Sequence, residues 1–118
     1  MCIGEVSLNT NDVIRLADFY KQLLGIDNGS NDPWHQVLLE GETSLTVYND
    51  GTRRNNLNQN ISLAFTVEDV YAAHRRLLDM GAEILEPPTR RPWGAINMSF
   101  RDPDGNILYF RQFAGGDA

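Results

Sequence analysis

The sequence predicts an α+β fold built from two copies of one strand–helix–strand unit, and three observations lead to that prediction. Sliding residues 6–13 by 57 positions lays them over residues 63–70 and brings Asp12 onto Asp69. Each of these aspartates opens a stretch with helical periodicity, and the flanking segments alternate between apolar and polar residues as half-buried strands do. A repeat of this length indicates two supersecondary units rather than a solenoid, which needs several shorter periods.

The first unit is expected to span residues 3–48. Asn11 or Asp12 can cap a helix whose apolar residues fall at helical spacing, and Gly25 can end it as a C-cap. The segments expected to form strands alternate in polarity or lie between turn residues, and they are residues 3–8, 34–40 and 42–48. A copy of the second unit's short strand is expected somewhere within residues 26–30, so two or three strands follow the helix.

The second unit repeats this order over residues 61–113, after a polar linker at residues 49–60. Asp69 is expected to cap its helix and Gly81 to end it. Its expected strands are residues 61–67, 83–86, 95–101 and 107–113, of which the second should stop at the two prolines that follow it. Residues 1–118 are therefore expected to form a single domain of two modules.

The alternation gives each predicted sheet one apolar face for its helix and one polar and aromatic face. The residues expected beneath the helices are Val6, Leu8, Leu45, Val47, Leu63, Phe65, Leu108 and Phe110. The opposite face could be solvated, as one face of an antiparallel sheet often is. Two sheets that curl together would instead enclose a cavity lined by that face.

Composition excludes several classes of function. The net charge of −6 disfavours nucleic acid as a partner, whereas it is compatible with a cationic small molecule. No apolar run approaches the roughly 20 residues of a membrane span, and no signal peptide is recognisable at the start. A lone Cys2 cannot form an internal disulfide or a cysteine-cluster metal site. The cytoplasm is the expected location.

The residues resemble those of the glyoxalase, bleomycin-resistance and extradiol-dioxygenase superfamily, also called vicinal oxygen chelate proteins. The resemblance covers about residues 3–113 and rests on the strand–Asn-Asp–Val–helix pattern, on its copy at residues 64–70, and above all on residues 100–110. It implies two βαβββ modules that form an open, U-shaped mixed β-barrel with the helices outside, and commonly a homodimer.

Metal-dependent members of that family place ligands on the first and last strand of each module. Matched by position, these four points are Glu5, Thr46, Ser62 and Tyr109 in this chain. Only the carboxylate is a good ligand for a divalent ion, because serine and threonine hydroxyls and a protonated phenol bind weakly. A one-residue shift of register would replace them with apolar residues. We therefore expect no metal and no other cofactor.

Histidine and tryptophan give the remaining chemistry. His35 and His74 are expected to be packed or surface residues, and no nucleophile–base constellation or phosphate loop appears in the sequence. Trp34 and Trp93 lie at or near the start of a strand in loosely equivalent places of the two units, where they could plug a rim or interface or could flank a flat or cationic ligand. Residues 90–94 resemble the proline–tryptophan–glycine loop of metal-free bleomycin-resistance proteins.

The sequence thus predicts a metal-free protein that binds a small organic molecule and sequesters it, as antibiotic-resistance members of the family do. The expected ligand-binding residues are Glu5, Trp34, Gln36, Thr46, Tyr48, Ser62, Trp93, Asn97, Tyr109 and Arg111. No catalytic residue is assigned, although Glu5 as base and Tyr109 as acid would allow metal-free catalysis. The alternatives are a metal-dependent lyase, isomerase or dioxygenase of the glyoxalase type, and a purely structural subunit.

Overall fold

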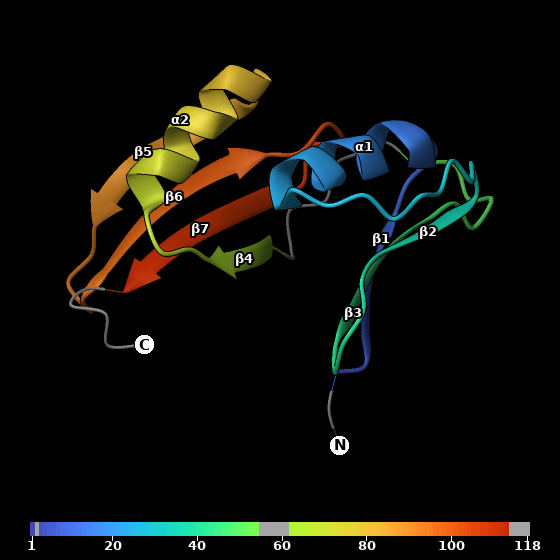
Figure 1. Cartoon of the computed structure of the whole chain (residues 1–118), viewed down its shortest axis with the longest axis horizontal. Helices are drawn as coiled ribbons and strands as arrows, with labels where there is room; N and C mark the ends of the chain where they lie inside the picture. The colour runs from blue at the N-terminus through green and yellow to red at the C-terminus, as the bar shows by residue number, and fades with distance from the viewer. Residues whose placement is uncertain (2, 55–61, 114–118) are drawn as a thin grey trace. The chain divides into compact units, whose positions relative to one another are not determined.

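The computed structural model describes residues 1, 3–54 and 62–113, which divide into two compact units. Unit 1 is Met1–Asn56 and unit 2 is Leu57–Ala118. Each unit packs one helix against its own sheet (Figure 1). The predicted α+β class is confirmed, with a three-stranded sheet in unit 1 and a four-stranded sheet in unit 2.

Unit 1 has the order strand, helix, strand, strand. Its elements are β1 (Glu5–Asn9), α1 (Val13–Leu24), β2 (His35–Leu39) and β3 (Ser44–Tyr48). The sheet order is β1-β3-β2, in which β1 lies parallel to β3 and β2 lies antiparallel to it. The first and last strands of the unit are therefore neighbours, as in a βαβ crossover.

The strand expected within residues 26–30 does not form, and that prediction was wrong. The backbone N–H of Gly29 donates to the Asp27 side chain, and that of Ser30 donates to the Asn28 side chain. Such local side-chain acceptors compete with strand pairing for the backbone groups. The segment therefore becomes a series of turns, and unit 1 has one strand fewer than unit 2.

Unit 2 has the complete strand–helix–three-strand order. Its elements are β4 (Ser62–Thr66), α2 (Val70–Met80), β5 (Glu83–Arg90), β6 (Ala95–Arg101) and β7 (Ile107–Phe113). The sheet order is β4-β7-β6-β5, and β4 lies parallel to β7. The prolines at 87 and 88 do not end β5 as expected. They are accommodated because β5 is an edge strand with two register shifts.

The two helices begin and end as the sequence predicts. The Asp12 side chain accepts a hydrogen bond from the Arg15 N–H, and the Asp69 side chain accepts from two N–H groups of the first turn of α2. Gly25 and Gly81 follow the helices in the left-handed conformation, which glycine adopts without strain. Neither helix among the described residues is long and apolar enough to cross a membrane.

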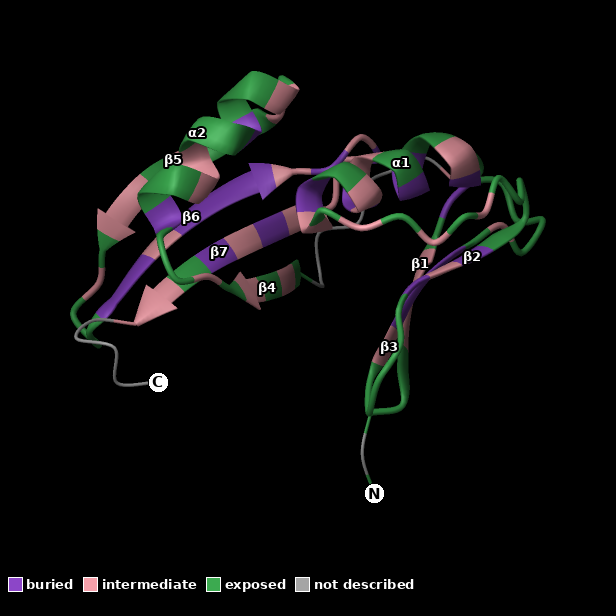
Figure 2. Cartoon of the chain, in the orientation of Figure 1, coloured by how far each residue is buried: buried purple, intermediate pink, exposed green. Residues whose placement is uncertain are grey.

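Burial alternates along β7 (Figure 2), whereas the central strands β3 and β6 are buried along most of their length. In β7 the side chains of Leu108 and Phe110 are buried, whereas Tyr109 is half-buried and Arg111 is exposed. The other core residues combine the inner face of each helix with the strands beneath it, and they are Val13, Leu16, Ala17, Tyr20, Leu23, Leu38, Leu45, Val47, Val70, Leu77, Ala95, Ile96, Met98 and Phe100. These positions set which sheet face remains open.

The first half of the expected linker belongs to unit 1. The Asn11 side chain donates to the Thr52 carbonyl and accepts from the Arg54 N–H, so residues 49–54 fold back onto the start of α1. Hydrogen bonds from the Thr52 backbone and from Arg54 hold the pKa of the Asp50 carboxyl below its ordinary value. The second half of the expected linker lies outside the described residues.

Candidate functional site

The open face of the unit 2 sheet is defined by one side chain on β7. Gln112 accepts a hydrogen bond from the Val70 N–H at the start of α2, at 2.8 Å, so the α2 side of the sheet is the side of Gln112. Successive residues of a strand point to opposite faces. Tyr109 and Arg111 therefore lie on the face that α2 leaves open, as the sequence predicts.

Three rows of side chains cross this open face, as the strand register shows. The rows, each in the order β4, β7, β6, β5, are Thr66–Arg111–Asn97–Thr89, Ala64–Tyr109–Ser99–Glu86 and Ser62–Ile107–Arg101–Glu83. Of the five predicted ligand-binding residues of this unit, Asn97, Tyr109 and Arg111 lie in the first two rows and Ser62 lies in the last, whereas Trp93 lies outside the rows. The sheet itself therefore brings the four residues of the rows onto one surface.

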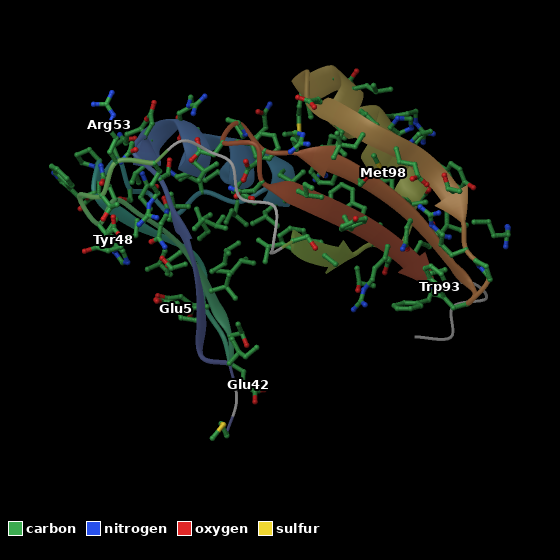
Figure 3. The ribbon with its side chains drawn as sticks, turned by 180° about the vertical axis from the view of Figure 1, so that it is seen from behind. Glu5, Glu42, Tyr48, Arg53, Trp93 and Met98 are labelled. Atoms are coloured by element: carbon green, nitrogen blue, oxygen red, sulfur yellow. The ribbon has the colours of Figure 1, made fainter. Side chains whose placement is uncertain are left out.

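The open face of unit 1 carries its own predicted residues. Ser7 pairs with Thr46 and Glu5 pairs with Ser44, so Glu5 and Thr46 share a face two positions apart. Thr46 is only 2% exposed because its short side chain lies on the central strand between neighbouring side chains. Tyr48 lies at the end of the same face, 5.7 Å from the His35 ring in an edge-to-face contact (Figure 3).

The four positions at which metal-dependent relatives hold an ion do not fit a metal here. Glu5 lies on β1 next to Ser44, and Ser62 lies on β4 next to Ile107. The strand register places Ser44, and no carboxylate or imidazole, opposite Glu5. Across the described part of the chain, no group of three His, Cys, Asp or Glu residues could hold a metal ion. The donor set is one carboxylate with neutral hydroxyls, which binds a divalent ion poorly.

Gln36 lies away from these two faces. It is 2% exposed and lines an open depression of about 520 Å³ in unit 1, together with Asn28, Ser30, His35, Val37, Leu38 and Glu40. Its amide donates to the Asp32 carbonyl and accepts from the Asn28 side chain. Both ends of the Gln36 amide are thus used to hold the loop before β2, so its ligand-binding role stays a prediction.

The two tryptophans are exposed at equivalent places. Trp34 directly precedes β2 and is 61% exposed, whereas Trp93 precedes β6 and is 69% exposed. Trp93 lies at the tip of the turn between β5 and β6, which the Arg91 N–H closes by donating to the Ala95 carbonyl at 2.7 Å (Figure 3). Large exposed aromatics at turn tips are available to a ligand or to another protein surface.

Arg111 and Asn97 are neighbours in the first row of unit 2. The Arg111 Nε donates to the Thr66 Oγ1 at 2.9 Å, and its guanidinium carbon lies 5.1 Å from the centre of the Phe113 ring. The Asn97 Oδ1 is buried and has no hydrogen-bond partner. Thr66 and Phe113 were not among the predicted site residues. The alternation of β4 and β7 could have indicated Thr66, but only the register places it beside Arg111.

Comparison with known proteins assigns the chain to a family. Residues 3–110 match the model of the Glyoxalase/Bleomycin resistance protein/Dioxygenase superfamily, so the chain belongs to this superfamily. The uncharacterized protein YraH of Bacillus subtilis (strain 168) is 26% identical over an alignment of 122 positions that covers 92% of this chain and 95% of YraH.

Solved structures agree with that fold. A glyoxalase-related enzyme from Fulvimarina pelagi superposes with a TM-score of 0.78 at 20% identity, covering 94% of this chain and 87% of the enzyme. Lactoylglutathione lyase from Agrobacterium tumefaciens superposes with a TM-score of 0.70 at 18% identity, covering 94% of this chain and 92% of the lyase. At these identities the likeness shows the fold alone.

Proposed function

We propose that this chain is a metal-free small-molecule-binding protein that sequesters an aromatic compound. The observation that carries this proposal is the combination of polar open faces with two exposed tryptophans, in a superfamily whose name includes resistance proteins. Indole rings attract flat and cationic ligands by stacking and cation–π contact. Glu5 and the net charge of −6 favour a cationic ligand at unit 1.

The test is a screen of aromatic compounds against the purified protein by tryptophan fluorescence and titration calorimetry. We expect saturable quenching at micromolar concentration by at least one compound, and the variants Trp34→Phe and Trp93→Phe identify which indole reports it. Arg75→Gln, at an exposed position on α2, is the control that should bind unchanged. A broad panel that perturbs neither indole and releases no heat contradicts the proposal.

The second candidate is a metal-dependent lyase, isomerase or dioxygenase of the glyoxalase type, which the fold likeness to lactoylglutathione lyase favours. The two candidates differ in one measurement, the metal content of protein purified without chelator. Sequestration predicts less than one equivalent of bound divalent metal and no saturable binding of Mn, Ni, Fe or Zn. One equivalent that is lost in Glu5→Ala supports the metal-dependent enzyme instead.

A homodimer is part of the same proposal, since the resemblance to the superfamily implies one. Sedimentation analysis of the free protein and of the protein with its ligand is the direct measurement. We expect a dimer in both states. A monomer at every concentration contradicts this part of the proposal and leaves the ligand-binding part standing.

A further inference from the structure

The first row of the open face of unit 2 has the geometry of a recognition site for an oxyanion. Thr66, Arg111 and Asn97 are consecutive cross-strand neighbours on β4, β7 and β6. Directly opposed residues of adjacent strands have Cβ atoms only about 5 Å apart. One small group of a ligand can therefore contact two of these side chains at once.

The guanidinium of Arg111 is held in place but not neutralised. Thr66 fixes its Nε, and Phe113 supports its plane. Within the part of the chain that the structure describes, Arg15, Lys21, Arg54, Arg91 and Arg101 are among the cations that pair with carboxylates, and Arg111 forms no ion pair. Two Nη nitrogens of a fixed fork remain to bind a carboxylate in a bidentate manner, which is a strong and directional interaction.

Asn97 adds a second requirement. Its buried Oδ1 lacks a hydrogen-bond partner, and a buried acceptor without a donor is unfavourable. Rotation of the amide about its last side-chain bond would turn Oδ1 out of this buried position, and a ligand above the sheet could then supply its hydrogen-bond donor. The group that satisfies Oδ1 must be a donor, such as a hydroxyl or an amino group, placed next to the group that Arg111 binds.

Two aromatic side chains at the same end of the sheet can contact the aromatic part of the ligand. Phe113 pairs with Ala95 in the row beyond Arg111, and Trp93 lies two residues before Ala95 on the turn. A flat ring can stack on either aromatic side chain while its substituents lie over the first row. Trp93 would then report binding by its fluorescence.

We propose that this row binds an aromatic carboxylate that carries a hydroxyl or amino donor beside the carboxylate, an inference that rests on the proposed ligand-binding function. Arg111 binds the carboxylate, Thr66 positions the guanidinium, and Asn97 accepts from the adjacent donor. A monoanion is favoured over a phosphate dianion because the chain already carries a net charge of −6. The cationic preference proposed above applies to unit 1.

The test compares the binding of four naphthalene probes to this chain, by titration calorimetry of the unchanged protein and by Trp93 fluorescence in Trp34→Phe. The probes are 3-hydroxy-2-naphthoate, 2-naphthoate, 2-naphthyl phosphate and 2-naphthylmethylammonium. We expect affinity to fall in that order for the first three. The ammonium probe should bind independently of Arg111. Tighter binding of the phosphate than of either carboxylate would overturn the choice of a carboxylate.

Variants separate the roles of the three side chains. Arg111→Gln should lower the affinity for both carboxylate probes at least tenfold and leave the affinity for the ammonium probe unchanged. Arg111→Lys keeps the charge but should lose part of the affinity for the carboxylates. Asn97→Leu should remove the preference for the hydroxylated naphthoate over plain naphthoate. Thr66→Val is expected to lower the affinity for the carboxylates a few-fold, and the control Arg75→Gln should change the affinity for none of the probes.

The outcomes distinguish this inference from the proposed function. An aromatic ligand that binds without preference for a carboxylate, and equally well in Arg111→Gln, overturns the inference while the proposed function stands. Absence of binding by all four probes and by the wider panel overturns both. Circular dichroism and thermal melting of each variant show that a lost affinity is not a lost fold, and Arg111→Lys repeats the test with the charge retained.

Discussion

Equivalent rows of the two units carry different chemistry on the same backbone. Tyr48 lies beside His35 at the end of β3, whereas the corresponding positions of unit 2 hold Arg111 beside Asn97. The equivalence follows from the register, because β1 and β4 pair with their last strands in the same parallel manner. The two units thus share the same pairing of first and last strands. One row holds an aromatic edge-to-face contact, and the other holds a fixed cation next to an amide whose oxygen lacks a hydrogen-bond partner.

The helices show a second inequality. α1 buries five residues, whereas α2 buries only Val70 and Leu77. Leu16 of α1 is fully buried, and the 57-residue repeat places Ala73, a half-buried residue, at the same point of α2. Both helices have their capping residues and a buried valine at the first position, Val13 or Val70. The two units therefore depend on their helices to different degrees, and substitutions at the helices and at the last turn of each unit compare the two units.

The largest effect is expected from Leu16→Ala in α1. It removes a fully buried side chain and leaves a cavity, which costs about 2–5 kcal/mol. The matched control is Leu78→Ala in α2, because Leu78 is 55% exposed and its loss should change stability by less than about 1 kcal/mol. Urea unfolding of both variants gives the two values. Equal losses would mean that the burial of Leu16 adds nothing to the stability of unit 1 and would break the comparison.

The next effect concerns the last turn of each unit. Asp102, between β6 and β7, is 5% exposed and accepts hydrogen bonds from the Asp104 N–H, the Asn106 N–H and the Asn106 side chain. Asp102→Ala should cost about 2–3 kcal/mol because it leaves buried donors unpaired. Glu42→Ala, in the exposed turn between β2 and β3, should be nearly neutral.

Asp102→Asn completes this comparison, since it keeps the shape and one acceptor oxygen but removes the charge. Its unfolding free energy should fall between those of the wild type and Asp102→Ala. If Asp102→Ala is as stable as Glu42→Ala in the same thermal or urea experiment, the hydrogen bonds of this turn do not stabilise unit 2.

The smallest effect is expected at the helix caps. Asp69→Ala should cost about 1 kcal/mol and Asp12→Ala less, because Asp69 accepts two N–H groups of its helix and Asp12 accepts one. Asp79→Ala, near the end of α2, is the control of opposite sign, since a negative charge near a helix C-terminus is unfavourable. A larger loss for Asp12 than for Asp69 contradicts the order.

Sequence periodicity predicted the helices well because their boundaries are local. The caps at Asp12 and Asp69, the glycines at Gly25 and Gly81, and the apolar spacing between them all lie within one segment. Of the two misjudged segments, residues 26–30 form turns through local side-chain acceptors, whereas the length of β5 depends on its partner strand. Pro87 fits inside β5 only because that strand is an edge strand with shifted register, which no local pattern reveals.

The sequence could predict which face of the sheet carries the candidate site, but it could not predict which residues lie side by side in one row of that face. Alternation places Tyr109 and Arg111 opposite Leu108 and Phe110, and the Gln112 contact with α2 confirms this choice of face. That Arg111 lies between Thr66 and Asn97 follows from pairing between three strands, which depends on the turn geometry and on the crossover. The ligand-binding role of these residues stays a prediction.

The parallel pairing of the first and last strand has a consequence for how each unit forms. Ser62 pairs with Ile107, so β4 finds no strand partner within the unit until the chain has travelled roughly forty residues and closed a loop of that size. Contacts so distant in sequence slow folding. Until β7 arrives, β4 is an unpaired strand that a second copy of the chain could capture, and exchange of β7 between copies is the form such a misassembly would take.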